Sequence, residues 1–293
     1  MTQRSISLAN GYGHISVTLE NRVDVFDWKR KVFEMAKMTW QSKDNLQFDM
    51  TDPDVQHLVW GPFEGKVLPT VLEQIQLIFI IRGMSRSCSH QFVRGRVGWA
   101  YNQQSQMAEV GLRDFTVPAH LYARPDLRER LEKLAADSAS LYNDIIGLGL
   151  PPQSARYVLP EGSQTDIYCV VNFPAFRGFV ANRTCLSTND EINIVARGMR
   201  RELLAVEPQW EKYLQQPCDR TGVCPLVDPV FPCCGKHPQN VVTKGMYSNA
   251  SNNCQIELAR LPDLHMHESD KRVSDAMMKF HSGRSHFDEK LHG

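Results

Sequence analysis

A short, largely apolar run near residue 78 limits what this chain can fold into. The run IQLIFII covers 75–81 and is followed at once by Arg82-Gly83. A membrane-spanning helix needs about 18 or more apolar residues in a row, and no segment of this chain approaches that. Short apolar runs bounded by glycine are typical of buried strands. We therefore predict a strand that is broken at Arg82-Gly83, followed by a more helical stretch up to residue 93.

Other segments carry helical periodicity. Residues 23–40 mix apolar and charged residues as a surface helix does. Residues 125–147 are predicted to form an amphipathic helix that ends at Gly147, before Pro151-Pro152. The apolar face expected for this helix consists of Leu127, Leu131, Leu134, Leu141 and Ile145.

A second strong helix is predicted to follow a short strand at 165–172. Thr188 and Glu191 have the spacing of a capping box, and Pro208 ends the periodic stretch. Its apolar stripe is Ile192, Val195, Met199, Leu203 and Val206. Strands and helices together indicate an α+β fold. Beyond residue 215 the composition shifts to Cys, Pro, Gly and Asn, so we predict a catalytic domain at 1–215 and an extension at 216–293.

The charge balance restricts the class of partner. The 293 residues include 33 basic and 33 acidic side chains, which gives a formal net charge of zero. General binders of nucleic acid or of membrane surfaces carry a basic excess, so we expect neither kind of partner. The first residues contain no apolar core of a signal peptide, and we expect a cytoplasmic protein. In that reducing setting Cys88, Cys169 and Cys185 are interpreted as small buried hydrophobic residues.

Polar residues that interrupt apolar elements mark a candidate site. They are Arg94, Arg96, Asn102, Gln103, Ser105, Arg156, Asn172 and Arg183. Guanidinium groups are planar bidentate donors that suit phosphates, and amide side chains match the edge of a pyrimidine or a flavin ring. The residues alone predict a pocket for a nucleotide-like anion. The alternative is that these arginines are ordinary surface or ion-paired residues.

Four blocks in this part of the chain carry a family resemblance. SRSCSHQFVRGRVGWAYNQQSQ, at 85–106, resembles the flavin-dependent thymidylate synthase motif, in which a Ser-Arg pair and a His/Gln pair precede Arg-His-Arg, seven residues and Ser. LPTVLEQIQLIFIIRGMSR and GLPPQSARYVLP resemble further family segments, as does NFPAFRGFVANRTCLSTNDEI. The blocks are collinear, and the resemblance covers roughly residues 20–215.

The resemblance implies an enzyme, a fold and a reaction. Such enzymes have a mixed or antiparallel sheet flanked by long helices, and they are homotetramers whose active sites are built from several subunits. They methylate dUMP at C5 to give dTMP, with the carbon from methylenetetrahydrofolate and the hydride from FAD reduced by NADPH. The flavin supplies the difficult chemistry, so no activated cysteine is required.

Residue roles follow from the same resemblance. The positions that correspond to nucleotide contacts are Gln91, Arg94, Gln103, Gln104, Ser105, Arg156 and Arg183. The positions that correspond to flavin contacts are Thr70, Arg94, Arg96, Asn102 and Asn172. Arg156 and the region of Ser105 would meet the phosphate. Arg183 would be the catalytic residue, because it would face the pyrimidine and stabilise negative charge on the ring as C5 becomes nucleophilic.

Several positions depart from the family pattern. Gly95 stands where the motif has its central His, and eight residues rather than seven separate Arg96 from Ser105. Gln103 replaces an acidic residue, and Met107 replaces an Arg on the phosphate side. Three interpretations stay open: a thymidylate synthase with an altered loop, a paralogue such as a dCMP methylase or a pyrimidine nucleotide hydroxymethylase, and an inactive nucleotide- or flavin-binding scaffold.

The extension contains a candidate metal site. Residues 217–238 read PCDRTGVCPLVDPVFPCCGKHP. A structural Zn²⁺ could be bound here by Cys218, Cys224, Cys233, Cys234 and His237. The alternative is a set of loop thiols without a metal, and Cys254 is not expected to be a ligand.

Overall fold

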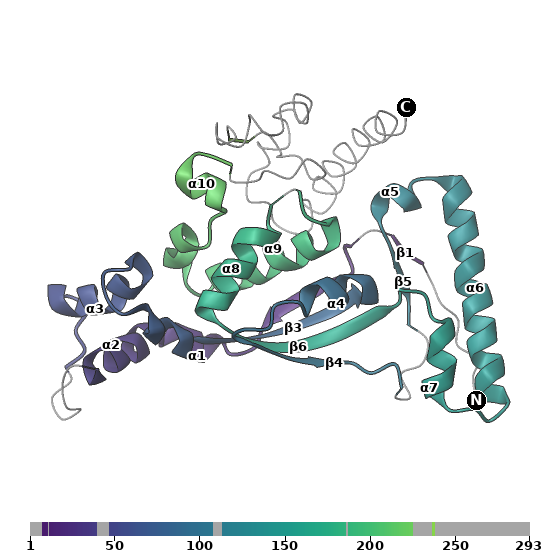
Figure 1. Ribbon diagram of the computed structural model, residues 1–293, viewed down its shortest axis with the longest axis horizontal. Coiled ribbons are helices and arrows are strands. Elements are labelled where there is room, and N and C mark those ends of the chain that lie inside the picture. Colours follow the sequence, from purple (N-terminus) through teal and green to yellow (C-terminus); the bar gives the residue numbers. More distant parts are fainter. Residues whose placement is uncertain are drawn as a thin grey trace.

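The computed structural model describes residues 8–10, 12–39, 47–107, 113–185, 187–224 and 236–237. These form an elongated molecule with a twisted sheet in its middle (Figure 1). Helices α2 (Trp28–Met38) and α3 (Pro53–Glu64) lie at one end, and the long helix α6 (Pro125–Gly147) lies at the other. Helices α8 (Phe173–Arg183) and α9 (Asp190–Leu204) lie over the sheet.

The remaining elements are short. The strands are β1 (Leu8–Asn10), β2 (Ser16–Leu19), β3 (Gln76–Ser85), β4 (Trp99–Gln103), β5 (Phe115–Val117) and β6 (Gln164–Asn172). The other α-helices are α1 (Arg22–Phe26), α4 (Arg86–Phe92), α5 (Ala119–Tyr122), α7 (Pro152–Ala155) and α10 (Pro217–Thr221). The 3₁₀ turns among the described residues are η2 (Pro69–Gln74), η3 (Arg156–Val158) and η4 (Pro208–Tyr213).

The main sheet is antiparallel, with strand order β2-β3-β6-β4. The strand predicted at 165–172 is confirmed as β6, but the predicted break at Arg82-Gly83 is wrong. Strand β3 continues to Ser85 through an irregularity between Ile81 and Met84. Gly83 takes a φ of 79° there, and its N–H donates to Asp166 Oδ1 at 2.9 Å. The residue expected to end the strand therefore bends it, because glycine adopts a left-handed conformation without a steric penalty.

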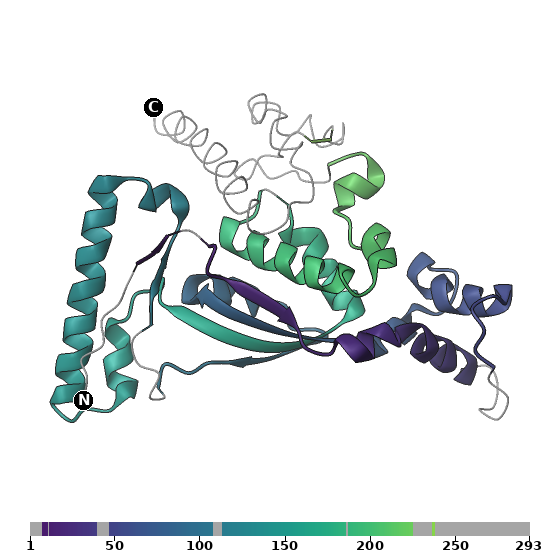
Figure 2. The ribbon, with the colours of Figure 1, turned by 180° about the vertical axis from the view of Figure 1, so that it is seen from behind.

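The two faces of the sheet differ in how they are covered. Side chains alternate between faces along each strand, and one set (Leu77, Phe79, Ile81, Ile167 and Val171) is fully buried. Phe79 stacks on Phe176 of α8 at 5.5 Å between ring centroids. Within the described chain no helix lies on the opposite face (Figures 1 and 2). That face carries half-buried Ile78, Ile80 and Val170 and exposed Tyr168.

The surface-helix prediction for 23–40 is confirmed, and one face of the segment packs into the core while Val23 and Phe26 stay exposed. The segment forms α1 and α2, and Trp28 has no exposed surface. The ring centroid of Trp28 lies 5.1 Å from those of Trp60 and Phe63 of α3, and 5.0 Å from that of Trp210 of η4. Its indole N–H donates to Glu207 Oε2 at 2.8 Å. This aromatic cluster holds one end of the molecule against η4.

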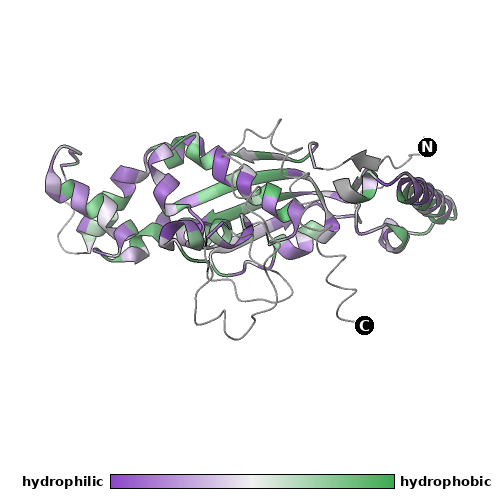
Figure 3. Ribbon diagram, turned by 90° about the horizontal axis from the view of Figure 1, so that it is seen from above, coloured by the Kyte–Doolittle hydropathy of each residue, from purple (hydrophilic) through white to green (hydrophobic). Residues whose placement is uncertain are grey.

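The predicted helix at 125–147 is confirmed as α6, but the face expected to be buried is not. The buried side chains are Ala135, Ser138, Ala139 and Tyr142, which face α7 and η3. Part of the predicted stripe is exposed, with Leu134 51% and Leu141 49% accessible. Figure 3 shows hydrophobic and hydrophilic residues around this helix at one end of the molecule. The part of the expected face at Leu134 and Leu141 therefore lacks a partner in the described chain.

The second strong helix is confirmed as α9, with a different cap. Its N-cap is Asn189, whose side chain accepts from Glu191 N. Thr188 instead donates to the carbonyls of Arg183 and Cys185. The expected stripe is buried through Leu203, and Val206 packs against the same core. No described helix is long and apolar enough to cross a membrane. The boundary at 215/216 stays a prediction.

Candidate functional site

Helix α4 connects most of the residues expected to bind ligands. Its buried side carries Cys88, Ser89 and Phe92, and its N-cap Ser85 accepts from Cys88 N at 2.9 Å. Gln91 lies half-buried on the other side. The chain then leaves the helix into the loop that carries the two motif arginines. Contacts that hold α4 in place therefore also position the start of the loop that carries Arg94 and Arg96.

A buried carboxylate attaches α4 to α9. Glu191 is 6% exposed and accepts two hydrogen bonds from Ser85, one from N–H and one from Oγ, both at 2.6 Å. Burial raises the pKa of Glu191 to about 7 against the opposing effect of the two Ser85 hydrogen bonds, and nearby Asp190 adds to the rise. The predicted capping box is therefore replaced by a contact that joins two separate family blocks.

We expect Glu191→Gln to flatten the dependence of stability on pH. The pKa of Glu191 is about 7 in the folded protein, whereas the ordinary pKa of a glutamate is 4.5. Folding thus favours the protonated form, so this group's contribution is full below pH 4.5 and is lost as the pH rises through about 7. The loss is roughly 1–3 kcal/mol. Thermal unfolding between pH 5 and 8 measures it. Equal slopes in the wild type and Glu191→Gln would contradict the assignment, and exposed Glu129→Gln is the control.

The adjacent amides of β4 lie on opposite faces of the sheet. Gln103 pairs with Ile167 in register and donates through Nε2 to Ser89 Oγ at 2.9 Å, on the α4 side. Asn102 pairs with Tyr168 and is exposed on the open face. Within one chain the two side chains cannot contact the same small ligand. The resemblance assigned Asn102 to the flavin and Gln103 to the nucleotide, and the structure places them apart.

The loop between α4 and β4 has a tight backbone. Gly98 has a φ of 75°, and an added Cβ would lie 2.6 Å from the Asn172 side chain. The Gly98 carbonyl accepts from Asn172 N at 2.9 Å. Because any larger residue would be strained and would displace Asn172, glycine is required here. The loop is thereby held at the end of β6.

Gly95, between the two motif arginines, has a different reason to be glycine. Its carbonyl accepts from Tyr101 Oη at 2.8 Å, and Tyr101 stacks on Trp99 at 5.4 Å between ring centroids. A Cβ at position 95 would lie 3.0 Å from Trp99 Nε1 and 3.1 Å from Tyr101 Oη. The aromatic pair therefore occupies the space beside this position. A histidine at 95 would require the pair to shift.

The expected arginines Arg94, Arg96 and Arg183 have no counterion among the described residues. Arg94 and Arg96 are exposed, and Arg183 is half-buried as the last residue of α8. Within the described chain their guanidinium groups make no hydrogen bond or ion pair. The positive charge of Arg183 is close enough to Cys88 to oppose the rise in the pKa of that thiol, which burial dominates. Arg183 therefore lies near α4 with its donors unused.

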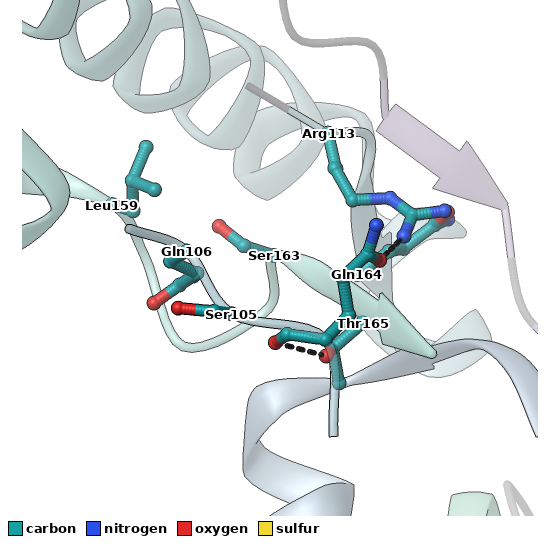
Figure 4. Close-up of a pocket in the computed structure, with 8 residues that line it drawn as sticks. Ser105, Gln106, Arg113, Leu159, Ser163, Gln164 and Thr165 are labelled. Carbon is teal, nitrogen blue, oxygen red and sulfur yellow. Dashed lines mark hydrogen bonds between the residues drawn. The ribbon is translucent and has the colours of Figure 1, made fainter. Parts of the chain in front are cut away.

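Further residues gather around a small pocket that opens to solvent (Figure 4). Its lining residues are Gln104, Ser105, Gln106, Arg113, Leu159, Ser163, Gln164 and Thr165. Arg156 lies nearby in the chain, at the start of η3, and is half-buried with its guanidinium 5.8 Å from the Tyr157 ring. The phosphate-side residues of the prediction, Ser105 and Arg156, thus belong to this end of the sheet.

Arg113 is a pocket residue that sequence reasoning missed. Its guanidinium contacts Gln104 Oε1 and forms an ion pair with Asp166 Oδ2 at 3.3 Å. Figure 4 shows its side chain beside Gln164. No recognised motif contains it, and the nearby departure at Met107 was its only signal: the expected phosphate-side arginine is missing there. In the structure Arg113 lines the pocket together with Ser105 and Gln106, which directly precede position 107.

The flavin positions lie mostly at the other end of the sheet. Asn172 ends β6 and caps α8, where its Oδ1 accepts from Ala175 N at 3.0 Å. Thr70 is exposed in η2, and η2 meets α8 through the Phe173 N to Ile75 O hydrogen bond. Arg96 precedes Gly98 in the loop bonded to Asn172. Asn102 is farther along β4.

The cysteines fall into two groups. Cys88 and Cys169 are buried as predicted, and burial raises the pKa of the Cys169 thiol to about 12. Cys185 is half-exposed, so the interpretation of that residue as buried is wrong. Of the predicted metal ligands, Cys218 lies close to His237 and Cys224 packs against Cys218. Cys233 and Cys234 lie outside the described residues.

Comparison with known proteins gives a consistent assignment. The family model described as thymidylate synthase complementing protein matches residues 24–209. A flavin-dependent thymidylate synthase of Thermococcus onnurineus is 33% identical over 177 residues, which cover 57% of this chain and 71% of the relative. One from Thermococcus kodakarensis is 32% identical over 232 residues, which cover 73% of this chain and 93% of the relative.

A solved structure supports the fold. The crystal structure of a UMP/dUMP methylase from Streptomyces cacaoi bound with 5-Br dUMP superposes with a TM-score of 0.53 and 18% identity. The match covers 69% of this chain and 94% of that one. The antiparallel sheet and the sequence matches point to the same family. Candidate arginines lie at both ends of that sheet. The chain belongs to the family of flavin-dependent thymidylate synthases, which are methyl-transferring enzymes.

Proposed function

We propose that this protein methylates C5 of dUMP to give dTMP, with methylenetetrahydrofolate as the carbon donor and FAD reduced by NADPH as the source of hydride. The observation that carries the proposal is that Arg94, Arg96 and Arg183 have no partner within the described chain. Unpaired guanidinium groups repel one another, and an anionic ligand relieves that cost. The family and the relatives' activity support the same reaction.

The chain's own side chains have distinct tasks in this proposal. Ser105 and Arg156 hold the phosphate from the pocket end of the sheet, where charge-assisted hydrogen bonds are strong. Gln91, Gln103 and Gln104 are assigned to the pyrimidine. The side-chain nitrogen Nε2 of Gln103 donates to Ser89. The side-chain oxygen of Gln103 is therefore left as an acceptor for a base N–H. Arg183 stabilises the negative charge that develops on the ring when C5 attacks.

The residues assigned to the flavin fit an anionic cofactor. Arg94 and Arg96 are exposed and have no counterion among the residues that the structure describes, so their donors are available for a pyrophosphate. The side-chain oxygen Oδ1 of Asn172 caps α8, and the side-chain nitrogen Nδ2 of the same residue is left to donate. Thr70 and Asn102 complete the assigned set. When bound, FAD would supply the hydride that reduces the transferred one-carbon unit to a methyl group.

We also propose that the active enzyme is a homotetramer with shared sites. Asn102 and Gln103 face opposite sides of the sheet, so their assigned ligands cannot both be enclosed by one chain. The open face of the sheet and the exposed leucines of α6 lack cover within the described residues. Association of identical chains would bury these surfaces and bring assigned residues of one subunit to another subunit's site.

Arg113 is proposed to contribute to phosphate binding in place of the arginine missing at position 107. We expect Arg113→Ala to raise the KM for the nucleotide about 10- to 100-fold, since a charge-assisted hydrogen bond contributes roughly 1.5–3 kcal/mol. Steady-state kinetics and flavin content measure it, with Arg124→Ala as the control because Arg124 pairs with Asp126 on the surface. An unchanged KM would leave Arg113 with a structural role only.

One experiment tests the reaction directly. The full-length protein is incubated with methylenetetrahydrofolate, FAD, NADPH and either dUMP or dCMP, and the nucleotide is analysed by mass spectrometry. We expect methylated dUMP and unreacted dCMP. A hydroxymethylated product, or reaction of dCMP alone, would reject the thymidylate synthase reaction in favour of the paralogue. Absence of flavin binding under saturating FAD would indicate a binding scaffold instead.

A further inference from the structure

Two buried cysteines pack together outside the main core. Cys218 lies in α10 and Cys224 follows it, and both are at most 7% exposed. They form a small cluster of their own. Gly222, with a φ of 71°, ends α10 and lets the chain turn between them. Two thiols are thereby brought side by side in a segment with little apolar surface to bury them.

A histidine from farther along the chain returns to the same place. His237 Nε2 lies 2.8 Å from Asp219 Oδ1. One ligand atom each from Cys218, Asp219 and His237 lie within 4.8 Å of one another. Ligand atoms around a tetrahedral Zn²⁺ are about 3.3–3.8 Å apart, given metal–ligand distances of about 2.0–2.3 Å. Small side-chain rotations would bring Cys218 and His237 to this spacing, and Cys224, which is outside that group of three, packs against Cys218.

The role of Asp219 follows from its neighbours. Its carboxylate is bonded to the imidazole of His237 and to Lys236 Nζ, the latter at 2.7 Å. A carboxylate that accepts from one ring nitrogen fixes the tautomer and leaves the lone pair of the other nitrogen for a metal. The Lys236 ammonium balances the charge of the carboxylate, which makes Asp219 a positioning residue. The soft donors are the two thiols and the ring nitrogen, a set that favours Zn²⁺.

We propose that Cys218, Cys224 and His237 bind a structural Zn²⁺ ion and that Asp219 orients His237. The ion would hold the start of the extension against the catalytic body. Gln216 Nε2 donates to the Thr184 carbonyl at 2.6 Å, one residue beyond Arg183. The metal site would therefore brace the loop that follows the proposed catalytic arginine. It goes beyond the proposed function and does not depend on it.

The test is metal analysis of the full-length protein, purified without added metal or chelator. We expect about one zinc per chain in the wild type, and background zinc in Cys218→Ser, Cys224→Ser and His237→Ala. Cys254→Ser is the matched control and should keep its zinc. Replacement by Co²⁺ should give a thiolate-to-cobalt charge-transfer band that is lost in the two cysteine variants.

Flavin content separates this proposal from failure to fold and from failure of the proposed function. Cys218→Ser is expected to lose zinc while retaining bound FAD, because the flavin positions lie outside the extension. Substoichiometric zinc in the wild type would overturn the site, as would full zinc in both Cys218→Ser and Cys224→Ser. A zinc-loaded protein without flavin would support the metal site and refute the proposed reaction.

Discussion

Replacement of Arg183 by alanine is expected to lower kcat about a hundredfold to a thousandfold, the range seen when a preorganised donor to developing charge is removed. The guanidinium is half-buried and has no partner within the described chain, so its donors are available to the reacting ring. The effect should fall mainly on kcat, because the charge it stabilises develops only in the transition state. Single-turnover and steady-state kinetics measure the loss.

Flavin affinity gives the contrast that identifies this role. Because Arg183 is assigned to the nucleotide, Arg183→Ala should bind FAD nearly as tightly as the wild type. Arg201→Ala is the control, since Arg201 lies in α9 and reaches Glu202 at 3.9 Å. Parallel losses of turnover and FAD affinity would mean that Arg183 supports the architecture of the site and not the developing charge.

The second large effect concerns α6. The double variant Leu134→Glu/Leu141→Glu is expected to reduce the native mass from that of a tetramer and to remove nearly all activity. The two leucines are about half-exposed and seven residues apart, the spacing of a helix-packing seam. Because they make little contact within the chain, charges there should spare the fold of each subunit. Light scattering and circular dichroism measure the mass and the fold.

A matched pair on the same helix tests the specificity of that result. Ala136 and Ser140 are also exposed, on a different side of α6. Ala136→Glu/Ser140→Glu should keep the mass and activity of the wild type. An unchanged mass in the leucine variant, or full activity of a dissociated subunit, would contradict shared active sites.

The sequence predicted the elements whose patterns are local. Residues 125–147 carry their own start and stop signals, and α6 has the same bounds. The strand at 165–172 and the helix before Pro208 are confirmed for the same reason. The four family blocks located most of the candidate site, since α4, its loop, β4 and α8 all fall within them.

Features that depend on distant partners were not predicted. Glu191 of α9 has capping-box spacing, but its carboxylate accepts hydrogen bonds from Ser85 at the end of β3. Arg113 has no motif, and it became visible only when folding placed it beside Gln104 and Asp166. The leucines of α6 are apolar as a core face would be, and periodicity does not distinguish a core from an interface between chains. In each case the deciding contact is far away in sequence.

The carboxylate of Asp166 has a consequence for how the pocket accepts an anion. One oxygen is held by the Gly83 N–H at the bend in β3, and the other is paired with Arg113. If Arg113 binds phosphate as proposed, an arriving phosphate would take the place of Asp166 on the guanidinium, while Asp166 stays anchored to the sheet through Gly83. The carboxylate would thus hold the arginine in position in the absence of substrate. Such an exchange of anions would occur between side chain and ligand.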